Sequence, residues 1–389
     1  MRTSEIQALL AQTDLDGWLL YDAHGLNPIA RQVVGLKRMV TRRWFVFIPR
    51  EGEPEAVIHI MEQPAFADLR AHRHTYLSWQ ELDQALRRIV RGRRVAMEYS
   101  PDNAIPYVAR VDAGTIEKVR ALGVDIVSSA DLVATMLACW SPAKIALHRR
   151  AADALIEIKD AAFRLITDQI SAHRTLHEYD VVQFIREEFA RRGMINDGEG
   201  PICAVDANAG DPHYEPGPQG SASIGPDQLV LLDLWAKHDT PDGVYADITW
   251  TGYTGRTIPA RIDSVFQVVA RSRDRGVEFL AKKMEGGSTV CGYEVDEAVR
   301  TVIVEAGYGD RFIHRTGHSL GANVHDVGPN IDNLETQDRR RLQDGVAFTI
   351  EPGIYLPEFG IRSEINVLIE RGRPVVTTLP LQRAVTPLL

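Results

Sequence analysis

Cysteine is scarce in this sequence, and the three that occur, Cys139, Cys203 and Cys291, are widely spaced. They form no Cys-x-x-Cys pair and no disulfide framework, so we expect reduced thiols and a cytoplasmic protein. No apolar run approaches the roughly 18 residues that a membrane-spanning helix requires. The opening stretch MRTSEIQALLAQTDLDGWLL carries acidic and polar residues throughout, unlike a secretory signal peptide. We therefore expect neither secretion nor a membrane partner.

The sequence also lacks an excess of basic residues. Its 44 lysines and arginines are outnumbered by 53 acidic residues, which gives a net charge of -9. Nucleic-acid-binding proteins usually present a basic face, so we expect no nucleic-acid partner. The remaining composition, 44% hydrophobic and 25% charged, is that of an ordinary globular protein. A chain of 389 residues is long enough for two domains.

An α/β domain is predicted over residues 1–140, where short apolar runs alternate with amphipathic segments. The predicted strands are GWLLYD (17–22), WFVFIPR (44–50), AVIHIM and RVAMEYS (94–100). The predicted helices are QPAFADLRAHR and SWQELDQALRRIVRG. We find no catalytic motif within this domain.

A second domain is predicted over residues 141–389. Ser141 followed by Pro142 is a typical helix start, and helical periodicity continues to about residue 172. A helix at about 176–192 follows, and then strands in PICAV, LVLLDLWAK and VYADITW. Two further helices, at about 259–284 and 292–306, precede strands in ANVHDV, VAFTIEPGIYL and SEINVLIE. This order suggests two similar halves in an α+β domain.

One glycine-rich segment, HRTGHSLGANVHD, holds three of the twelve histidines: His314, His318 and His325. The zinc-protease pattern H-E-x-x-H does not apply, because Arg315 stands where its glutamate would be. Gly317 and Gly321 also disfavour a helix, so we expect a turn that leads into a strand. The pattern alone leaves open which histidine binds a metal.

Four carboxylates lie in or beside strands that are otherwise apolar. They are Asp233 in LVLLDLW, Asp247 in VYADITW, Glu351 after VAFTI and Glu364 before INVLI. An acid in such a strand is costly unless it is paired or bound to a metal. If the four converge, they cannot all stay ionised without cations, because like charges raise one another's pKa. Carboxylates with one imidazole suit manganese, iron, cobalt or zinc, and a pair of ions can activate a bridging water.

With the histidine segment, these acids resemble the Asp-Asp-His-Glu-Glu set of the M24 metallopeptidases. This pita-bread family includes methionine aminopeptidase, aminopeptidase P, prolidase and the non-metal creatinase. YADIT, TGHSLGANVHD, TIEPGIY and GIRSEINVLI resemble its motifs in order and spacing over about 235–389, and NAGDPHYEP (208–216) extends the match. The first domain resembles that of the creatinase/prolidase type. The resemblance therefore implies an α/β N-terminal domain followed by an α+β pita-bread catalytic domain.

The resemblance also implies two divalent metal ions and their ligands. The implied ligands are Asp233, Asp247, His318, Glu351 and Glu364. Asp247 and Glu364 would bridge the ions, and Glu351 would also accept a proton from the bridging water. Manganese is favoured, with cobalt or zinc as alternatives.

Further site residues are implied by the same match. His213 and His325 resemble the histidines that hydrogen-bond the substrate and the tetrahedral intermediate. His314 resembles the histidine that lines the proline pocket of the Xaa-Pro branch. Tyr355 and Arg362 resemble the tyrosine and arginine that surround the metal pair, and we count Arg362 among the catalytic residues.

The implied function is hydrolysis of an Xaa-Pro peptide bond by a hydroxide that bridges two metal ions. Trp235 and Trp250 depart from the family pattern, which has a small residue and an arginine at these positions. We favour a dipeptidase (prolidase), because the added indoles suggest a tighter, closed pocket. An Xaa-Pro aminopeptidase acting on longer peptides is the alternative. A non-catalytic pita-bread binding module is disfavoured, because such relatives lose the acids.

A dipeptidase must also hold the free carboxylate of the C-terminal proline, and arginine is its natural partner. In this family the N-terminal domain typically leans over the active site of the partner subunit in a homodimer. The stretch VTRRW places Arg42 and Arg43 just before a predicted strand. We therefore expect a homodimer in which one of these arginines reaches the substrate.

Overall fold

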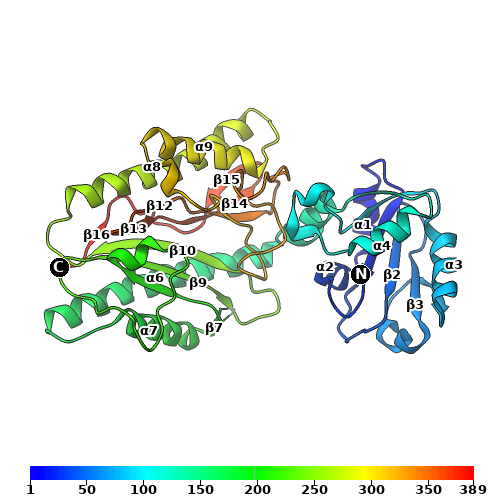
Figure 1. Cartoon of the computed structure of the whole chain (residues 1–389), viewed down its shortest axis with the longest axis horizontal. Helices are drawn as coiled ribbons and strands as arrows, with labels where there is room; N and C mark the ends of the chain where they lie inside the picture. Colours follow the sequence, from blue (N-terminus) through cyan, green and yellow to red (C-terminus); the bar gives the residue numbers. More distant parts are fainter. Residues whose placement is uncertain (197) are drawn as a thin grey trace. The chain divides into compact units, whose positions relative to one another are not determined.

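The computed structural model describes residues 1–196 and 198–389, and the chain divides into two compact units, Met1–Leu137 and Ala138–Leu389 (Figure 1). Within the described residues, no helix taken singly has both the length and the apolar character needed to cross a membrane. One bent pair, Ala130–Ala138 with Pro142–Ser171, meets that criterion jointly by length and composition alone.

The N-terminal unit is built on a six-stranded sheet of order β4-β3-β2-β1-β5-β6, in which β1 pairs parallel with β5 and antiparallel with β2. Its strands are β1 (Gly17–Asp22), β2 (Trp44–Pro49), β3 (Glu55–His59), β4 (His72–Tyr76), β5 (Arg94–Met97) and β6 (Asp125–Ser128). Its α-helices are α1 (Thr3–Leu10), α2 (Pro28–Val34), α3 (Trp79–Val90), α4 (Ala113–Arg120) and α5 (Ala130–Val133).

All four strands predicted in this unit are present, and so is the helix predicted from SWQELDQALRRIVRG, which is α3. Ser78 and Glu81 form a capping box at its start. The helix predicted from QPAFADLRAHR is wrong. Ile60–Phe66 form a 3-10 helix that contains Pro64, and the stretch ends in β4. Strand β4 lies at the edge of the sheet and is mostly exposed, so its sequence lacks the apolar alternation of a half-buried strand.

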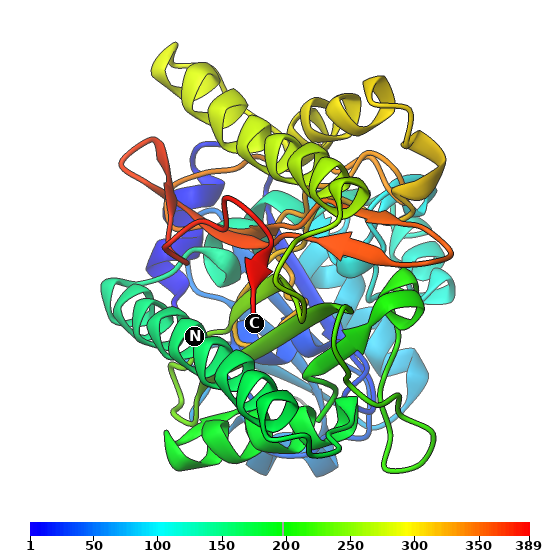
Figure 2. The ribbon, with the colours of Figure 1, turned by 90° about the vertical axis from the view of Figure 1, so that its left-hand side faces the viewer.

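In the C-terminal unit, two helical layers enclose the sheets: α6 and α7 lie on one side, and α8 and α9 on the other (Figure 1; Figure 2). The helices are α6 (Pro142–Ser171), α7 (Glu178–Arg191), α8 (Ala260–Glu285) and α9 (Gly292–Glu305). The strands are β7 (Met194–Ile195), β8 (Ile202–Val205), β9 (Leu229–His238), β10 (Ala246–Tyr253), β11 (Ala347–Ile350), β12 (Gly353–Tyr355), β13 (Gly360–Arg362), β14 (Ile365–Glu370), β15 (Arg373–Val376) and β16 (Thr386–Pro387).

These strands form three groups. The first has the order β16-β10-β9-β7, with β8 also paired to β9; the others are β11-β14-β15 and the hairpin β12-β13. The four predicted helices and the predicted order of helices and strands are confirmed. The strand predicted in ANVHDV is wrong, because the chain turns back on itself there. The Asp326 N–H donates to the Ser319 carbonyl (3.0 Å), and a Cβ at Gly321 would lie 1.6 Å from the Asp326 carboxylate.

The β9–β10 hairpin has one apolar face and one polar face. Leu232, Leu234 and Ile248 belong to the buried cluster that also includes residues of α6. Asp233 and Thr249 are directly opposite each other across the two strands, as are Trp235 and Asp247. Because side chains alternate along a strand, these four point away from α6. The hairpin thus carries two of the predicted ligands on one face.

A buried histidine ties α6 to this region. His148 is fully buried; its Nδ1 lies 2.8 Å from the Tyr245 carbonyl and its Nε2 lies 2.7 Å from Thr377 Oγ1. Since a carbonyl only accepts, Nδ1 carries the proton and Nε2 accepts from the threonine hydroxyl. Burial lowers the pKa of His148 to about 4 from its usual 6.5. The ring is therefore neutral in the folded protein near neutral pH.

We expect this histidine to make the protein sensitive to acid. The unfolded chain binds the proton more tightly than the folded protein, so stability is lost as the pH falls from 6.5 towards 4. His148→Phe should reduce that loss by on the order of 3 kcal/mol, while destabilising the protein at pH 7 through two lost hydrogen bonds. Urea denaturation at pH 7 and pH 4.5 measures both effects. Thr377→Val is the control, because it breaks one bond but keeps the titrating ring. An unchanged pH dependence in His148→Phe would contradict the assignment.

Candidate metal centre

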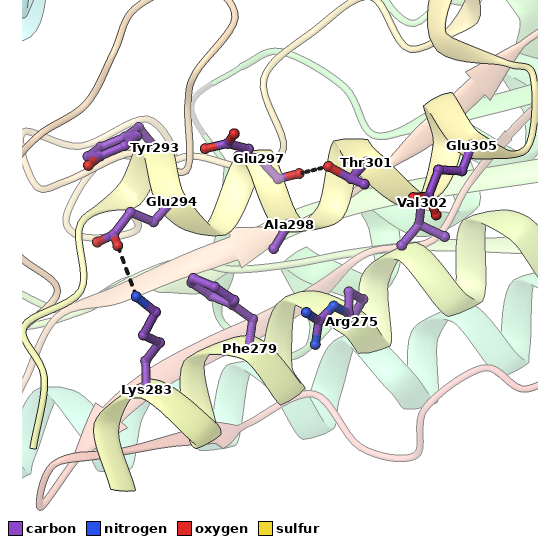
Figure 3. Close-up of a pocket in the computed structure, with 10 residues that line it drawn as sticks. All are labelled: Arg275, Phe279, Lys283, Tyr293, Glu294, Glu297, Ala298, Thr301, Val302 and Glu305. Atoms are coloured by element: carbon purple, nitrogen blue, oxygen red, sulfur yellow. Dashed lines mark hydrogen bonds and ion pairs between the residues drawn. The ribbon is translucent and has the colours of Figure 1, made fainter. Parts of the chain in front are cut away.

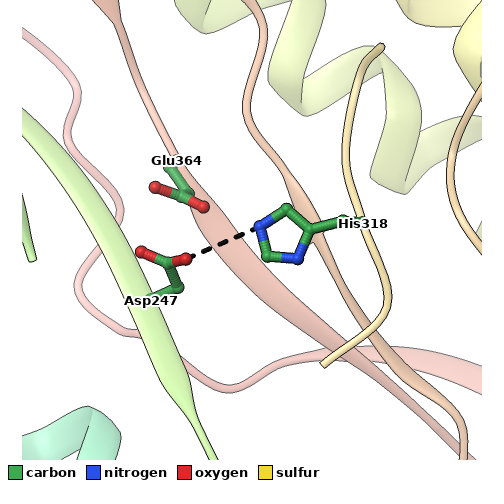
Figure 4. Close-up of side chains that lie close together, drawn as sticks. All are labelled: Asp247, His318 and Glu364. Carbon is green, nitrogen blue, oxygen red and sulfur yellow. Dashed lines mark ion pairs between the residues drawn. The ribbon is translucent and has the colours of Figure 1, made fainter. Parts of the chain in front are cut away.

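Three predicted ligands converge on one buried point: Asp247 on β10, His318 in the glycine-rich segment and Glu364 just before β14 (Figure 4). One ligand atom from each lies within 4.8 Å of the other two. His318 Nε2 is 3.6 Å from Asp247 Oδ2 and 3.4 Å from Glu351 Oε1, so Glu351 adjoins the same cluster. The structure thus gathers side chains from three separate parts of the sequence.

The backbone on both sides of His318 is paired with neighbouring segments. Gly317 pairs with Ile331, and Ser319 pairs with Phe348 of β11. A Cβ at Gly317 would lie 2.0 Å from the Thr349 carbonyl, so only glycine fits there. The His318 N–H donates to Thr349 Oγ1 (2.9 Å), and that hydroxyl donates to Glu351 Oε1 (3.0 Å). One threonine therefore braces two predicted ligands.

Asp233 is held by a buried arginine. Arg362 donates to Asp233 Oδ2 through Nη2, to Thr249 Oγ1 through Nε (3.0 Å) and to the Tyr355 hydroxyl through Nη1 (3.0 Å). Thr249 in turn donates to Glu364 Oε2 (2.8 Å). The guanidinium supplies one positive charge close to the acids and orients two of them.

The proton positions along the other arm of this network are fixed. Arg362 can only donate, so the Tyr355 hydroxyl accepts from it and donates to His314 Nε2, 2.8 Å away. His314 Nδ1 then donates to the Arg315 carbonyl, 2.7 Å away. Burial, with Arg362 nearby, lowers the pKa of His314 to about 3, and burial raises the pKa of Tyr355 to about 12. Both nitrogens of His314 are engaged, so it can line a pocket but cannot form a further hydrogen bond without breaking one.

The electrostatics of the cluster favour a bound cation. Burial, reinforced by repulsion from Asp247, Glu351 and Asp233, raises the pKa of Glu364 well above its usual range. Burial also raises the pKa of Glu351 and lowers the pKa of His318, which keeps the imidazole neutral and able to ligate.

The donor set also fits divalent metal ions. Within residues 1–196 and 198–389, no hydrogen-bond donor reaches two buried carboxylate oxygens, Asp233 Oδ1 and Glu364 Oε1. Buried charged oxygens of this kind are costly unless something positive meets them. Carboxylates with one neutral imidazole are ligands that manganese, iron, cobalt and zinc accept. The residues present therefore fit the predicted metal pair.

The remaining predicted residues lie at the margin of this cluster or outside the unit. The ring of His325 is 4.3 Å from that of His318, centroid to centroid. Interaction with His318 is the main cause that lowers the pKa of His325, and His213 contributes, so His213 lies within electrostatic reach. His213 itself is exposed. Arg42 and Arg43 belong to the N-terminal unit, where Arg42 Nη1 lies 3.6 Å from Glu62.

The two tryptophans do not both face the site, which corrects the expectation that both indoles narrow it. Trp250 packs in the cluster beside α6, where Lys159 Nζ lies 3.7 Å from its ring centroid. It is three residues from Asp247, so strand alternation places it on the opposite face. Trp235 does share the face of Asp247, its cross-strand partner. A Cβ at Gly200 would lie 2.1 Å from the Trp235 ring, so this indole rests directly on the Gly200 backbone.

Several supporting residues escape prediction from the sequence. Asp296 and Arg300 on α9 form an ion pair (3.0 Å). Arg300 also donates a hydrogen bond to the His314 carbonyl (2.8 Å), and Asp296 accepts one from the Thr316 N–H (2.9 Å). These bonds hold the start of the glycine-rich segment. Their i, i+4 spacing is visible in the sequence but is common on helix surfaces. Thr249 gives a better signal, since it lies two residues after Asp247 and so on the same face.

A separate groove of about 540 Å³ lies between α8 and α9 (Figure 3). Phe279 and Lys283 line it from α8, and Tyr293 and Glu294 from α9, with Lys283 and Glu294 paired at 3.5 Å. None of the predicted site residues lines this groove.

Comparison with known proteins identifies the family. The model of metallopeptidase family M24 matches residues 146–371, and the chain belongs to that family. The Xaa-Pro dipeptidase of Lactobacillus helveticus is 32% identical over 175 residues, which are 45% of this chain and 43% of that protein. The matches span about half the length of the first curated relatives, 56% and 43%.

Solved structures extend the likeness to the whole chain. The prolidase from Thermococcus sibiricus matches with a TM-score of 0.67 at 21% identity, over 99% of this chain and 98% of that one. The X-prolyl aminopeptidase from Caenorhabditis elegans, described as having a di-nuclear active site, matches with a TM-score of 0.67 at 17% identity, over 98% and 62%. These likenesses confirm the predicted fold, an α/β N-terminal domain followed by an α+β pita-bread domain of the creatinase/prolidase type.

Proposed function

We propose that this protein is a binuclear metallopeptidase that hydrolyses Xaa-Pro bonds, with Xaa-Pro dipeptides as the favoured substrates. The observation that carries the proposal is the buried convergence of Asp247, His318 and Glu364, with Glu351 and the unsatisfied oxygen of Asp233 beside them. When bound, two divalent ions, manganese by preference, would supply a bridging hydroxide at neutral pH and polarise the scissile carbonyl.

The residues of the chain have distinct proposed roles. Asp233, Asp247, His318, Glu351 and Glu364 hold the metal pair. Glu351 accepts a proton, a role that suits a carboxyl whose pKa is raised by burial. The rings of His325 and His213 donate hydrogen bonds to the substrate and to the developing oxyanion. Arg362 orients Asp233 and, through Tyr355, fixes the ring of His314 at the wall of the proposed proline pocket.

A proline substrate agrees with this chemistry. Proline gives a tertiary amide without an N–H and with a fixed φ, so peptidases that hydrogen-bond an extended strand handle it poorly. The chemistry that bound divalent ions would supply, an activated water and a polarised scissile carbonyl, would not require that N–H. The Lactobacillus helveticus relative is named an Xaa-Pro dipeptidase, which supports the dipeptide preference. Trp235 shares the strand face of Asp233 and Asp247, and we propose that its indole narrows the site on that side.

An activity panel tests the proposal. The purified protein is stripped with a chelator, dialysed, reloaded with Mn²⁺, Co²⁺ or Zn²⁺, and assayed on Ala-Pro, Ala-Pro-Ala and Met-Ala-Ser. We expect hydrolysis of Ala-Pro that depends on added metal. Faster cleavage of Ala-Pro-Ala would favour an aminopeptidase. No cleavage of any peptide with both metal sites filled would favour a non-catalytic binding module.

We further propose that the chain forms a homodimer in which Arg42 or Arg43 binds the carboxylate of the dipeptide. Arg42→Ala or Arg43→Ala should then lower kcat/KM for Ala-Pro by about 1.5–3 kcal/mol, as for a charged hydrogen bond. Cleavage of Ala-Pro-Ala should scarcely change, because its carboxylate lies one residue further on. Arg88→Ala, an exposed arginine on α3, is the matched control. Equal losses on both peptides in both variants would remove the idea.

A further inference from the structure

Glu178, the first residue of α7, organises a long connection in the C-terminal unit. Its side chain is fully buried. Its carboxylate accepts hydrogen bonds from the Val205 N–H (2.8 Å), Asn208 Nδ2 (3.0 Å), the Tyr214 hydroxyl (2.5 Å) and the Ala222 N–H (2.8 Å). All four partners belong to residues 205–222, which run from the last residue of β8 through most of the connection to β9 and carry His213.

The same connection packs against the hairpin that carries Tyr355 and Arg362. A Cβ at Gly210 would lie 2.6 Å from the Leu356 carbonyl, and a Cβ at Gly360 would lie 1.8 Å from the Ala209 carbonyl. Backbone therefore meets backbone at both points, and no side chain fits between them. The segment is held from one side by Glu178 and from the other by β12–β13.

We propose that Glu178 is a positioning residue, which acts as an anion to hold residues 205–222 so that His213 is presented to the metal centre. The expected effect of Glu178 on catalysis rests on the proposed function, whereas its role in holding residues 205–222 does not. Every partner of the carboxylate is a donor, so only a group that accepts on both oxygens suits the site. An amide would direct an N–H at a donor and leave that donor unsatisfied.

The first test observes His213 directly and needs no activity. In the protein loaded with diamagnetic Zn²⁺, Glu178→Gln should shift and broaden the ring resonance of His213 in a histidine-labelled NMR spectrum. Hydrogen exchange at the Val205 and Ala222 amides should accelerate. Tyr214→Phe, which removes one of the four donors and keeps the ring, should give a smaller change of the same kind. Metal content should stay constant, because none of the proposed ligands lies in the segment.

The second test separates positioning from general stability. Glu178→Gln should lower kcat/KM for Ala-Pro by about tenfold in the parent protein, and by less than about twofold when His213 is already alanine. The matched control is Glu98→Gln in the N-terminal unit, another buried glutamate that accepts three side-chain donors. It should leave the His213 resonance in place and show no such coupling.

The outcomes are separable. An unmoved His213 resonance in both Glu178→Gln and Tyr214→Phe overturns the proposal, whatever the activity. If the His213 resonance moves but the losses in kcat/KM from Glu178→Gln and His213→Ala are additive in the double variant, Glu178 has only a structural role. That result overturns the catalytic part of the proposal. A moved resonance in a protein that cleaves no peptide supports the anchor, while the proposed function fails.

Discussion

Replacing Glu364 with alanine is expected to abolish binding of both metal ions and, with it, all peptidase activity. Glu364 is proposed to bridge the ions, and one oxygen of its carboxylate meets no donor among the described residues. The apo form of the variant should also be more stable than the apo parent. Burial and three neighbouring acids raise the pKa of Glu364, so its removal relieves both repulsion and desolvation. Asp247→Ala should lose both ions in the same way.

Elemental analysis and thermal unfolding measure the two halves of this result. Added Mn²⁺ should raise the unfolding temperature of the parent, because a ligand that binds only the folded state stabilises it, but not that of Glu364→Ala. Glu370→Ala is the matched control, because Glu370 is the last residue of β14, six residues after Glu364, and is paired with Arg149 (2.7 Å). Full metal content in Glu364→Ala or in Asp247→Ala would remove the proposed ligand set.

The second large effect is expected at His325. His325→Ala should keep both metal ions and the fold, yet lower kcat for Ala-Pro by roughly 10²-fold, as when one hydrogen-bond donor to a developing oxyanion is lost. The ring lies 4.3 Å from that of His318 at an interplanar angle of 80°, adjacent to the ligand cluster but not part of it. Its lowered pKa keeps the ring neutral at the pH of the assay.

A matched variant shows whether a substitution in the glycine-rich segment lowers activity by disturbing the backbone rather than by removing the His325 ring. Asn323→Ala changes an exposed side chain two residues away and should leave both kcat and metal content unchanged. If His325→Ala lost metal, the assignment of His318 as the metal ligand and of His325 as a hydrogen-bond donor to the substrate would be wrong. If it kept full activity, His213 would be the remaining candidate for the oxyanion donor.

The parts of the site that could be predicted from the sequence are those where a residue type is unusual for its local sequence, such as an acid within an apolar strand. An aspartate in LVLLDLW or VYADITW is conspicuous because acids avoid buried strands, and the strands that carry or adjoin the four acids, β9, β10, β11 and β14, lie at the predicted positions. The glycines around His318 excluded a helix, and the structure shows why: Gly317 lies against the Thr349 carbonyl. Such features leave a local signature.

Other parts left no local signature. Glu178 reads as an ordinary acid in the first turn of a helix, since its four partners lie 27 to 44 residues further along the chain. The pairing of Arg362 with Asp233 spans 129 residues and depends on how two sheets meet. The orientation of Trp250 could have been inferred, because an odd separation from Asp247 reverses the face in a strand. Its large aromatic side chain suggested that Trp250 lies near the proposed metal site, but its position three residues after Asp247 places it on the other face of the strand.

The pairing of β9 with β10 sets a limit on how this hairpin can change in length. The paired residues run from Leu229 to Ala236 and from Ala246 to Tyr253, and the turn between the strands occupies 239–245. A single residue inserted between the turn and Asp233 in β9, or between the turn and Asp247 in β10, would shift that strand's register by one. The aspartate would then face the apolar layer beside α6, and the neighbouring Leu234 or Ile248 would face the proposed metal site. Residues inserted in the turn would leave both aspartates in place. Loop grafts and insertions in this protein should therefore be tolerated at 239–245, whereas insertions a few residues to either side should eliminate the proposed metal binding.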